Sequence, residues 1–209
     1  MTVHRPLFLP GSPAPAEQRR GLLLCDRDGT VIENRSDYVL SPADIVLLPG
    51  AVAALRAAAG HGLALVFVSN QSPVGRGLLT EADCLRIQRT LVDRLEAEGV
   101  PVAGSYLCPH APESGCGCRK PAPGMLRLAQ RRFGAAPEQC ALIGDSVEDM
   151  DAAAGAGARP VLVRTGRGAE HEPRVRARAD LGHVAVVADL GAAVESLIGD
   201  GTRFGRRSA

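Results

Sequence analysis

The feature that most constrains the fold is a repeated alternation of short apolar runs with helix-like segments. The apolar runs are candidate strands at residues 22–25, 63–68, 105–107, 141–143, 161–163 and 184–187. Helical spacing or composition marks residues 51–59, 81–98, 124–133 and 147–154. Strict alternation of strand and helix is typical of βαβ units. We therefore expect an α/β fold in which helices cover a central parallel sheet.

The composition narrows the classes of function that such a fold could serve. The chain has 209 residues with 24 Lys and Arg against 23 Asp and Glu, so its formal net charge is +1. A general nucleic-acid binder normally carries a strong basic excess, and aromatic side chains for base stacking make up only 3% here. No apolar run approaches the ~18 residues of a transmembrane helix. We therefore expect no nucleic-acid partner and no membrane partner.

The two ends of the chain differ from its middle and predict the domain organisation. Residues 1–20 contain four prolines and no continuous apolar stretch of the kind found in secretory signals. Residues 199–209 are rich in Gly and Arg. We interpret these ends as a flexible N-terminal arm and a flexible tail around one domain at residues 21–198. Without a secretory signal we expect a cytoplasmic location, and without a long amphipathic interface we expect a monomer.

An acidic segment follows the first predicted strand, at the end where parallel sheets bind ligands. It reads Asp26-Arg27-Asp28-Gly29. Residues two apart on an extended chain point to the same side, so we expect the carboxylates of Asp26 and Asp28 to lie together, with Arg27 turned away. Such a pair suits a hard cation, or covalent catalysis with one nucleophile and one proton donor. A solvated Asp-Gly turn is the alternative, and this segment alone does not separate the two.

Three further segments could bind phosphate or a cation. Residues 69–72 follow the second strand with neutral hydrogen-bond donors. Arg119 and Lys120 precede a predicted helix, and a guanidinium fork beside an ammonium suits phosphate. Asp145 follows the fourth strand, and a second acidic strand end favours Mg²⁺. Taken singly, each segment could also be an ordinary polar loop or solvated surface.

The spacing of the cysteines predicts a second metal site. Within eleven residues lie four soft ligands, Cys108, His110, Cys116 and Cys118. Three thiolates and one imidazole fill a tetrahedral Zn²⁺ site and leave no open position, so we expect a structural zinc that stiffens the loop before the basic pair. Disulfides or reduced thiols are the alternatives. The remaining cysteines lie in or near apolar segments and are expected in the core: Cys25, Cys84 and Cys140.

Taken in order, the strand-end motifs resemble those of the haloacid dehalogenase (HAD) superfamily. The four motifs are Asp26-Arg27-Asp28-Gly29-Thr30, Ser69-Asn70, Lys120 and Gly144-Asp145. Within the superfamily the chain is similar to the group of D,D-heptose 1,7-bisphosphate phosphatases and histidinol phosphatases, because residues 108–121 resemble the zinc loop of that group. The likeness extends over residues 22–168. It implies a Rossmann-like three-layer sandwich with a central parallel sheet, a zinc-stabilised loop and no large cap domain.

The resemblance also implies a role for each matched residue. Asp26 would be the nucleophile that forms an aspartyl-phosphate, and Asp28 would protonate the leaving oxygen and then activate water. Ser69 and Lys120 would stabilise the transferring phosphoryl group. Mg²⁺ would be held by the Asp26 carboxylate, the Asp28 backbone carbonyl and Asp145. Substrate recognition, including the second phosphate at Arg119, would fall to Arg35, Ser36, Asp37, Tyr38, Asn70, Gln71, Ser72, Arg119, Lys120 and Ser146.

The predicted activity is that of a Mg²⁺-dependent phosphatase acting on a small phosphorylated sugar. The reaction would remove the 7-phosphate of D-glycero-D-manno-heptose 1,7-bisphosphate. Residues 75–77 and 123–125 are more similar to the heptose members of the group than to the histidinol members. A histidinol-phosphate phosphatase stays as one alternative, and a catalytically inactive zinc-containing binding module stays as another.

Overall fold

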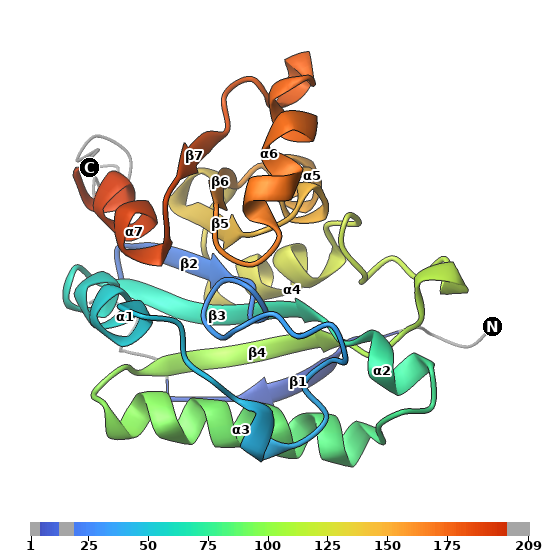
Figure 1. Cartoon of the computed structure of the whole chain (residues 1–209). Helices are drawn as coiled ribbons and strands as arrows, with labels where there is room; N and C mark the ends of the chain where they lie inside the picture. Colours follow the sequence, from blue (N-terminus) through green and yellow to red (C-terminus); the bar gives the residue numbers. More distant parts are fainter. Residues whose placement is uncertain (1–4, 13–18, 200–209) are drawn as a thin grey trace.

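The computed structural model describes residues 5–12 and 19–199 of the chain. In these residues seven strands form one sheet with the order β1-β4-β3-β2-β5-β6-β7 (Figure 1). The strands are β1 Leu7–Pro10, β2 Gly21–Cys25, β3 Leu63–Asn70, β4 Val102–Cys108, β5 Cys140–Gly144, β6 Arg159–Val163 and β7 Ala185–Val187. Every neighbouring pair is parallel except β1 with β4. The chain runs outward from β2 to β4 and then outward on the other side from β5 to β7, so the strand order reverses between β2 and β5.

Helices cover both faces of the sheet and complete three layers. They are α1 Ala51–Gly60, α2 Ser72–Gly75, α3 Glu81–Ala97, α4 Gly124–Phe133, α5 Val147–Ala156, α6 Gly168–Arg176 and α7 Leu190–Gly199. One face is covered by α1, α3 and α7, and the other by α4 and α5, with α6 packed beside α5 (Figure 1). The two helical layers and the sheet between them confirm the predicted three-layer α/β fold. Residues 19–199 contain no inserted cap domain. Within the described ranges, no helix has both the length and the apolar character needed to cross a lipid bilayer.

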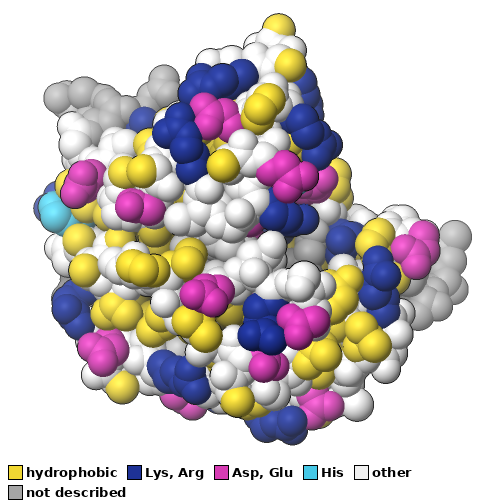
Figure 2. Space-filling view, in the orientation of Figure 1, with side chains coloured by type: hydrophobic (Ala, Val, Ile, Leu, Met, Phe, Trp, Pro, Cys, Tyr) yellow, Lys and Arg dark blue, Asp and Glu magenta, His cyan; other side chains and the backbone are white. Residues whose placement is uncertain are grey.

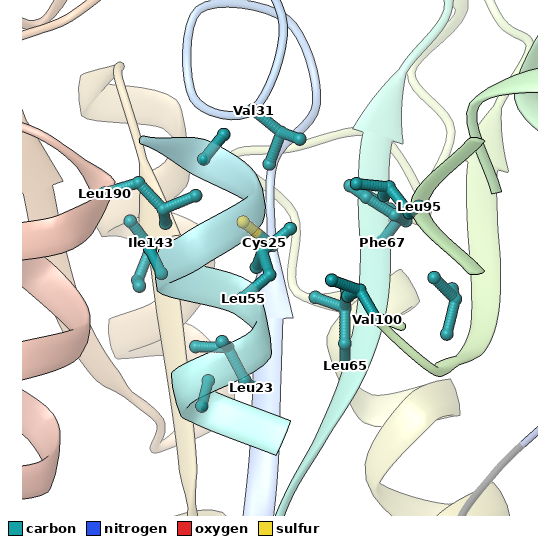
Figure 3. Close-up of a cluster of buried hydrophobic side chains, with 14 of the residues drawn as sticks. Leu23, Cys25, Val31, Leu55, Leu65, Phe67, Leu95, Val100, Ile143 and Leu190 are labelled. Carbon is teal, nitrogen blue, oxygen red and sulfur yellow. The ribbon is translucent and has the colours of Figure 1, made fainter. Parts of the chain in front are cut away.

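The core shows why an apolar run such as β2 becomes a central strand. Every residue of β2 is buried, and alternate side chains serve opposite faces of the sheet. Leu23 and Cys25 pack in the cluster that includes α1 and α7, whereas Leu22 and Leu24 pack in the cluster that includes α4 and α5. Figure 3 shows Leu23 and Cys25 on the side of β2 that faces Leu55 of α1. A strand that is buried on both faces needs apolar residues on both, so it has a continuous apolar sequence, as residues 22–25 do.

Local signals account for the ends of the predicted helices. Thr80 is the N-cap of α3, as expected, and its hydroxyl accepts a hydrogen bond from the Asp83 backbone N–H while the Asp83 carboxylate accepts one from Thr80. Helix α4 begins and ends at the predicted residues, and Gly134 follows it in a left-handed conformation. Helices α6 and α7 were not predicted, and most strands extend beyond the predicted apolar runs.

The expectation of a flexible N-terminal arm is wrong for part of that arm. Strand β1 lies within it and pairs along β4, with the Phe8 ring centroid 4.8 Å from that of Tyr106. The apolar run Leu7-Phe8-Leu9 is as long as the predicted strand at residues 141–143, but it lies between prolines in a segment interpreted as an arm, and its pairing partner is far away in the sequence. Residues 1–4 and 13–18 of the arm, and residues 200–209 of the predicted tail, lie outside the described part of the chain.

Candidate active site

The predicted strand-end residues meet at one edge of the sheet, beside the reversal of strand order between β2 and β5. Parallel sheets bind ligands beyond the carboxyl ends of their strands at such a reversal. A cavity of about 730 Å³ opens there, and its wall includes Asp26, Asp28, Ser69 and Lys120. The fold therefore brings the four motifs together, although more than 90 residues separate the first from Lys120.

Asp26 belongs to a buried ion cluster with Lys120 and Asp149. The Lys120 Nζ lies 2.6 Å from Asp26 Oδ1 and 2.5 Å from Asp149 Oδ1, and all three residues are buried. Burial lowers the pKa of Lys120, but the two carboxylates outweigh burial and raise that pKa above its ordinary value. Lys120 therefore stays protonated, which is the state that can stabilise a phosphoryl group.

Asp149 is a site residue that the sequence analysis did not assign. Its Oδ2 accepts hydrogen bonds from the Ser146 hydroxyl at 2.5 Å and from the Ser146 backbone N–H at 3.1 Å, so it also caps the first turn of α5. A usable signal was present, because Ser146 and Asp149 have the spacing of a capping box. That spacing directs the Asp149 side chain back toward Ser146, the residue that follows Asp145.

Asp145 completes a set of carboxylates that fits a divalent cation. Oxygens of Asp26, Asp145 and Asp149 all lie within 4.8 Å of one another. Asp145 is fully buried: its Oδ2 accepts a hydrogen bond from the Arg167 backbone N–H at 2.9 Å, whereas its Oδ1 has no partner among the described residues. Burial raises the pKa of Asp145 to about 7, and the neighbouring carboxylates of Asp26 and Asp149 add to the shift. An unpartnered carboxylate oxygen inside an acidic cluster is the type of ligand that Mg²⁺ takes.

Gly29 explains how the acidic loop packs so closely against Asp145. Its φ is +84°, and a Cβ on this residue would lie 2.1 Å from Asp145 Oδ2. A glycine is therefore required both by the backbone conformation and by the lack of space. The Thr165 hydroxyl donates a hydrogen bond to the Gly29 carbonyl at 2.7 Å and ties the two loops together.

The prediction that Arg27 turns away from the site is wrong. Arg27 is only 2% exposed, and its guanidinium donates to both carboxylate oxygens of Asp28 at 3.0 Å. The extended conformation of β2 ends at Cys25, so the two-residue period of a strand no longer sets the directions of the residues that follow. Asp26 and Asp28 both line the cavity, but Asp26 pairs with Lys120 while Asp28 pairs with Arg27.

The residues after β3 hold the basic pair in place. The Asn70 amide and the Lys120 backbone exchange two hydrogen bonds of 3.0 Å. The Arg119 Nη1 donates to the Ser72 hydroxyl at 2.9 Å. Asn70, Ser72, Arg119 and Lys120 all line the cavity, so the structure brings these predicted substrate-binding residues together.

The loop between β2 and α1 contributes only some of its predicted residues to the cavity. Arg35 and Tyr38 line it, and Arg35 forms an ion pair of 3.0 Å with Asp37. Ser36 and Asp37 are exposed, and neither is part of the wall. Tyr38 adopts a φ of 67°, a left-handed conformation that is uncommon for a residue with a side chain.

Two arginines of the cavity wall were not predicted. Arg76 follows the short helix α2, and Arg167 precedes α6. Arg76 lies in the segment 75–77 that resembles the heptose members, but no site role was predicted for it, and Arg167 lies in none of the motifs. On the face seen in Figure 2, Lys and Arg side chains are interspersed with Asp and Glu rather than gathered into one continuous patch.

The four predicted zinc ligands also meet. The three cysteine sulfurs are 3.4–3.6 Å apart, and His110 Nδ1 lies 3.2 Å from Cys118 Sγ. A tetrahedral site with Zn–S bonds of about 2.3 Å requires sulfurs about 3.8 Å apart, so the arrangement fits this metal. All six cysteines of the chain are free, which excludes the disulfide alternative within the structure. Hydrogen bonding from Cys118 lowers the pKa of Cys108 to about 5, which favours the thiolate that a metal needs.

Comparison with known proteins agrees with the fold and with the chemistry of the site. The HAD-hydrolase-like family model matches residues 117–193, which contain Lys120, Asp145 and Asp149. This match, together with the buried aspartate–lysine cluster at the sheet edge, indicates a hydrolase of the HAD-like class. A D-glycero-β-D-manno-heptose-1,7-bisphosphate 7-phosphatase of Bordetella bronchiseptica is 38% identical over 147 residues, which cover 70% of this chain and 82% of that protein.

Other relatives agree with this match. An enzyme of the same name from Pseudomonas putida is 36% identical over 147 residues, covering 70% of this chain and 84% of its own. The crystal structure of the Bordetella bronchiseptica D,D-heptose 1,7-bisphosphate phosphatase, complexed with magnesium and phosphate, superposes with a TM-score of 0.80. That alignment has 34% identity and covers 86% of this chain and 99% of the other. The chain belongs to the D-glycero-β-D-manno-heptose-1,7-bisphosphate 7-phosphatase family.

Proposed function

We propose that this phosphatase hydrolyses the 7-phosphate of D-glycero-D-manno-heptose 1,7-bisphosphate through an aspartyl-phosphate intermediate. The observation that carries the proposal is the position of Asp26, on the wall of a cavity of about 730 Å³ and 2.6 Å from Lys120. The names of the relatives support the choice of sugar. The same cavity is lined by four arginines, which could bind both phosphates of such a substrate: Arg35, Arg76, Arg119 and Arg167.

Two displacements at phosphorus account for the reaction. In the first, an Asp26 carboxylate oxygen bonds to phosphorus, the bond from phosphorus to the sugar oxygen breaks, and Asp28 gives its proton to that oxygen. In the second, Asp28 takes a proton from water, the water oxygen bonds to phosphorus, and the bond from phosphorus to the Asp26 oxygen breaks, which releases phosphate and frees the Asp26 carboxylate. Lys120 and Ser69 bind the phosphoryl oxygens in both displacements, because their donors lie on the cavity wall.

We further propose two metal ions with different roles. Mg²⁺ would be held by the carboxylates of Asp26 and Asp145 with the backbone carbonyl of Asp28, and it would neutralise phosphoryl charge when bound. The unpartnered Asp145 Oδ1 supports this assignment, as does the magnesium in the related crystal structure. Zn²⁺ would be held by Cys108, His110, Cys116 and Cys118 as a structural ion. Substrate contacts of the loop at residues 35–38, a monomeric state and a cytoplasmic location stay predictions, as does the single domain predicted at residues 21–198, whose sheet also includes β1.

Release of inorganic phosphate tests the proposal. The wild-type chain and Asp26→Asn would be assayed with both anomers of the heptose bisphosphate and with histidinol phosphate. Asp26→Asn should lower kcat by at least about 10³-fold, because the nucleophile is lost. Asp180→Asn, a change at an exposed carboxylate outside the cavity, is the matched control and should leave kcat unchanged. Normal turnover by Asp26→Asn would rule out the aspartyl-phosphate, and a higher kcat/KM for histidinol phosphate would rule out the heptose substrate.

A further inference from the structure

The guanidinium of Arg27 has no part in the two displacements, yet it lies against the residue that transfers the proton. Arg27 is only 2% exposed. A buried charge is costly unless it is paired and hydrogen-bonded. The fold therefore buries a cation next to Asp28, despite the cost of removing that charge from water.

Arg27, Asp28 and Gln71 form a closed ring of hydrogen bonds. The Arg27 Nη2 donates to Asp28 Oδ1, and its Nε donates to Asp28 Oδ2, both at 3.0 Å. The same Nη2 donates to Gln71 Oε1 at 3.0 Å, and Gln71 Nε2 donates to Asp28 Oδ2 at 3.1 Å. Each of the three side chains is thus bonded to the other two, which determines the plane in which the carboxylate lies.

Gln71 extends this ring to a second residue of the reaction. Its Nε2 also donates to the Ser69 hydroxyl at 3.0 Å, and the Gln71 residue is only 2% exposed. The amide is therefore satisfied by protein groups on both its oxygen and its nitrogen. Gln71 lines the cavity, as predicted for a substrate-binding residue, and its interactions also point to a role in orienting Asp28 and Ser69.

We propose that Arg27 is a positioning residue for Asp28, with Gln71 as its support. The proposal rests on the proposed function, since it assumes that Asp28 transfers the proton. Proton transfer requires the carboxylate within hydrogen-bond reach of the reacting oxygen. Among the described residues, the side chains that hydrogen-bond to the Asp28 carboxylate are those of Arg27 and Gln71. Asp26 is held by a separate partner, Lys120, so the acid and the nucleophile are oriented independently.

Arg27→Met is the first variant to test, on two substrates that differ in their need for a proton donor. The sugar oxygen of the heptose bisphosphate is a poor leaving group, whereas the phenolate of p-nitrophenyl phosphate leaves without protonation. We expect kcat/KM for the heptose bisphosphate to fall by about 10- to 100-fold, as for a misplacement of about 1 Å. The loss for p-nitrophenyl phosphate should be at least threefold smaller. Arg27→Lys should be intermediate, because an ammonium cannot form the two-point fork.

A double-mutant cycle with Asp28→Asn separates positioning from a general structural effect. If Arg27 acts through Asp28, adding Arg27→Met to Asp28→Asn should cost less than a further twofold in kcat/KM. An equal loss in both backgrounds, or an equal loss on both substrates, would overturn the proposal.

Control measurements test whether the variants fold and whether the proposed function itself is correct. Arg178→Met removes a similar fork to Asp180 outside the cavity and should leave kcat/KM unchanged. If thermal unfolding shows that Arg27→Met does not fold, Gln71→Met supports the same cycle with the same expected outcomes. Lack of wild-type turnover on both substrates would contradict the proposed function instead, so the two failures are distinguishable.

Discussion

The two candidate metal sites of this chain are built in opposite ways. The zinc ligands lie within residues 108–118, on one strand end and the loop that follows it. The carboxylates come from the ends of β2 and β5 and from the first turn of α5, and Lys120 joins them from a fourth segment. A site made by one loop is visible in the spacing of the sequence, whereas a site made by several strands exists only once the sheet has formed.

The electrostatics of the two sites also differ. Hydrogen bonding from Cys118 lowers the pKa of Cys108 to about 5, while the same pairing raises the pKa of Cys118, so the loop without an ion favours the thiolate of Cys108 and disfavours that of Cys118. Burial raises the pKa of Asp26 to about 6 and that of Asp145 to about 7, although Lys120 opposes the shift at Asp26. In the zinc loop, local hydrogen bonds therefore set which thiol ionises first, whereas in the acidic cluster burial raises the pKa of both carboxyl groups. Besides Lys120, the half-exposed Arg167 lies near the acidic cluster, with its Nε 3.9 Å from Asp145 Oδ2, and the pKa values of Asp26 and Asp145 stay raised all the same, so a bound cation would complete their ionisation.

The largest expected effect comes from withdrawing the cation of the acidic cluster. Brief treatment with EDTA should lower kcat by more than about 10²-fold, because the metal supplies much of the charge neutralisation. Adding Mg²⁺ alone should restore turnover, while the zinc content measured by mass spectrometry stays constant. Restoration by Zn²⁺ and not by Mg²⁺ would reverse the roles that we assign to the two sites.

Removing the ammonium at the centre of the acidic cluster should be the next largest effect. Lys120 is the single lysine of the sequence, and Lys120→Met leaves the carboxylates of Asp26 and Asp149 buried without their cation. The free energy of unfolding, measured with urea, should fall by about 3–5 kcal/mol. Added Mg²⁺ should recover part of that loss, because it binds the same carboxylates. A variant as stable as the wild type would show that the buried ion pairs contribute nothing.

Breaking the zinc loop should affect stability before chemistry. Cys116→Ser should reduce the bound zinc and lower the free energy of unfolding by about 2 kcal/mol. Activity should fall as well, because the loop leads directly into Arg119, whose Nη1 also donates to the His110 carbonyl at 3.4 Å. Cys84→Ser is the matched control, since Cys84 is also buried but is not among the zinc ligands. An unchanged zinc content in Cys116→Ser would contradict the assigned site.

The smallest effect is expected for ion pairs at the surface whose residues are not part of the cavity wall. Hydrogen bonds from Arg164 and Arg176 lower the pKa of Glu172 to about 2. A depressed folded-state pKa gives stability that is present above the unfolded-state value, near 4.5, and is lost as the pH falls through about 2. Glu172→Gln should therefore lower the unfolding temperature slightly at pH 7, with a difference that narrows below pH 4. A constant difference at all pH values would show that the effect is not ionic.

The strand-end motifs could be predicted because each follows an apolar run that becomes a buried strand. Period and polarity together place Asp26, Ser69 and Asp145 at the same edge of a parallel sheet. The direction of Arg27 was mispredicted because the strand period stops at Cys25. Asp149 had a local signal in its capping-box spacing with Ser146 that was not used.

Other features had no local signal of their place in the fold. Arg76 and Arg167 line the cavity because the fold carries their loops there, and strand β1 exists because β4 offers it a free edge. Neither a loop arginine nor a four-residue edge strand has a periodicity that reports its distant partner. These features depend on contacts between segments and not on the pattern within one segment.

By itself, the sequence determined the layered fold and the chemistry that it carries, since hydrophobic periodicity and ligand spacing are local properties of the chain. Only the tertiary structure decided which charges pair. Lys120 lies between Asp26, 94 positions away, and Asp149, 29 positions away, and Arg27 turns inward to Asp28 and Gln71. Burial makes these pairings strong, because a charge removed from water must find its partner within the protein. Which partner is within reach is settled by the packing of the sheet and its loops.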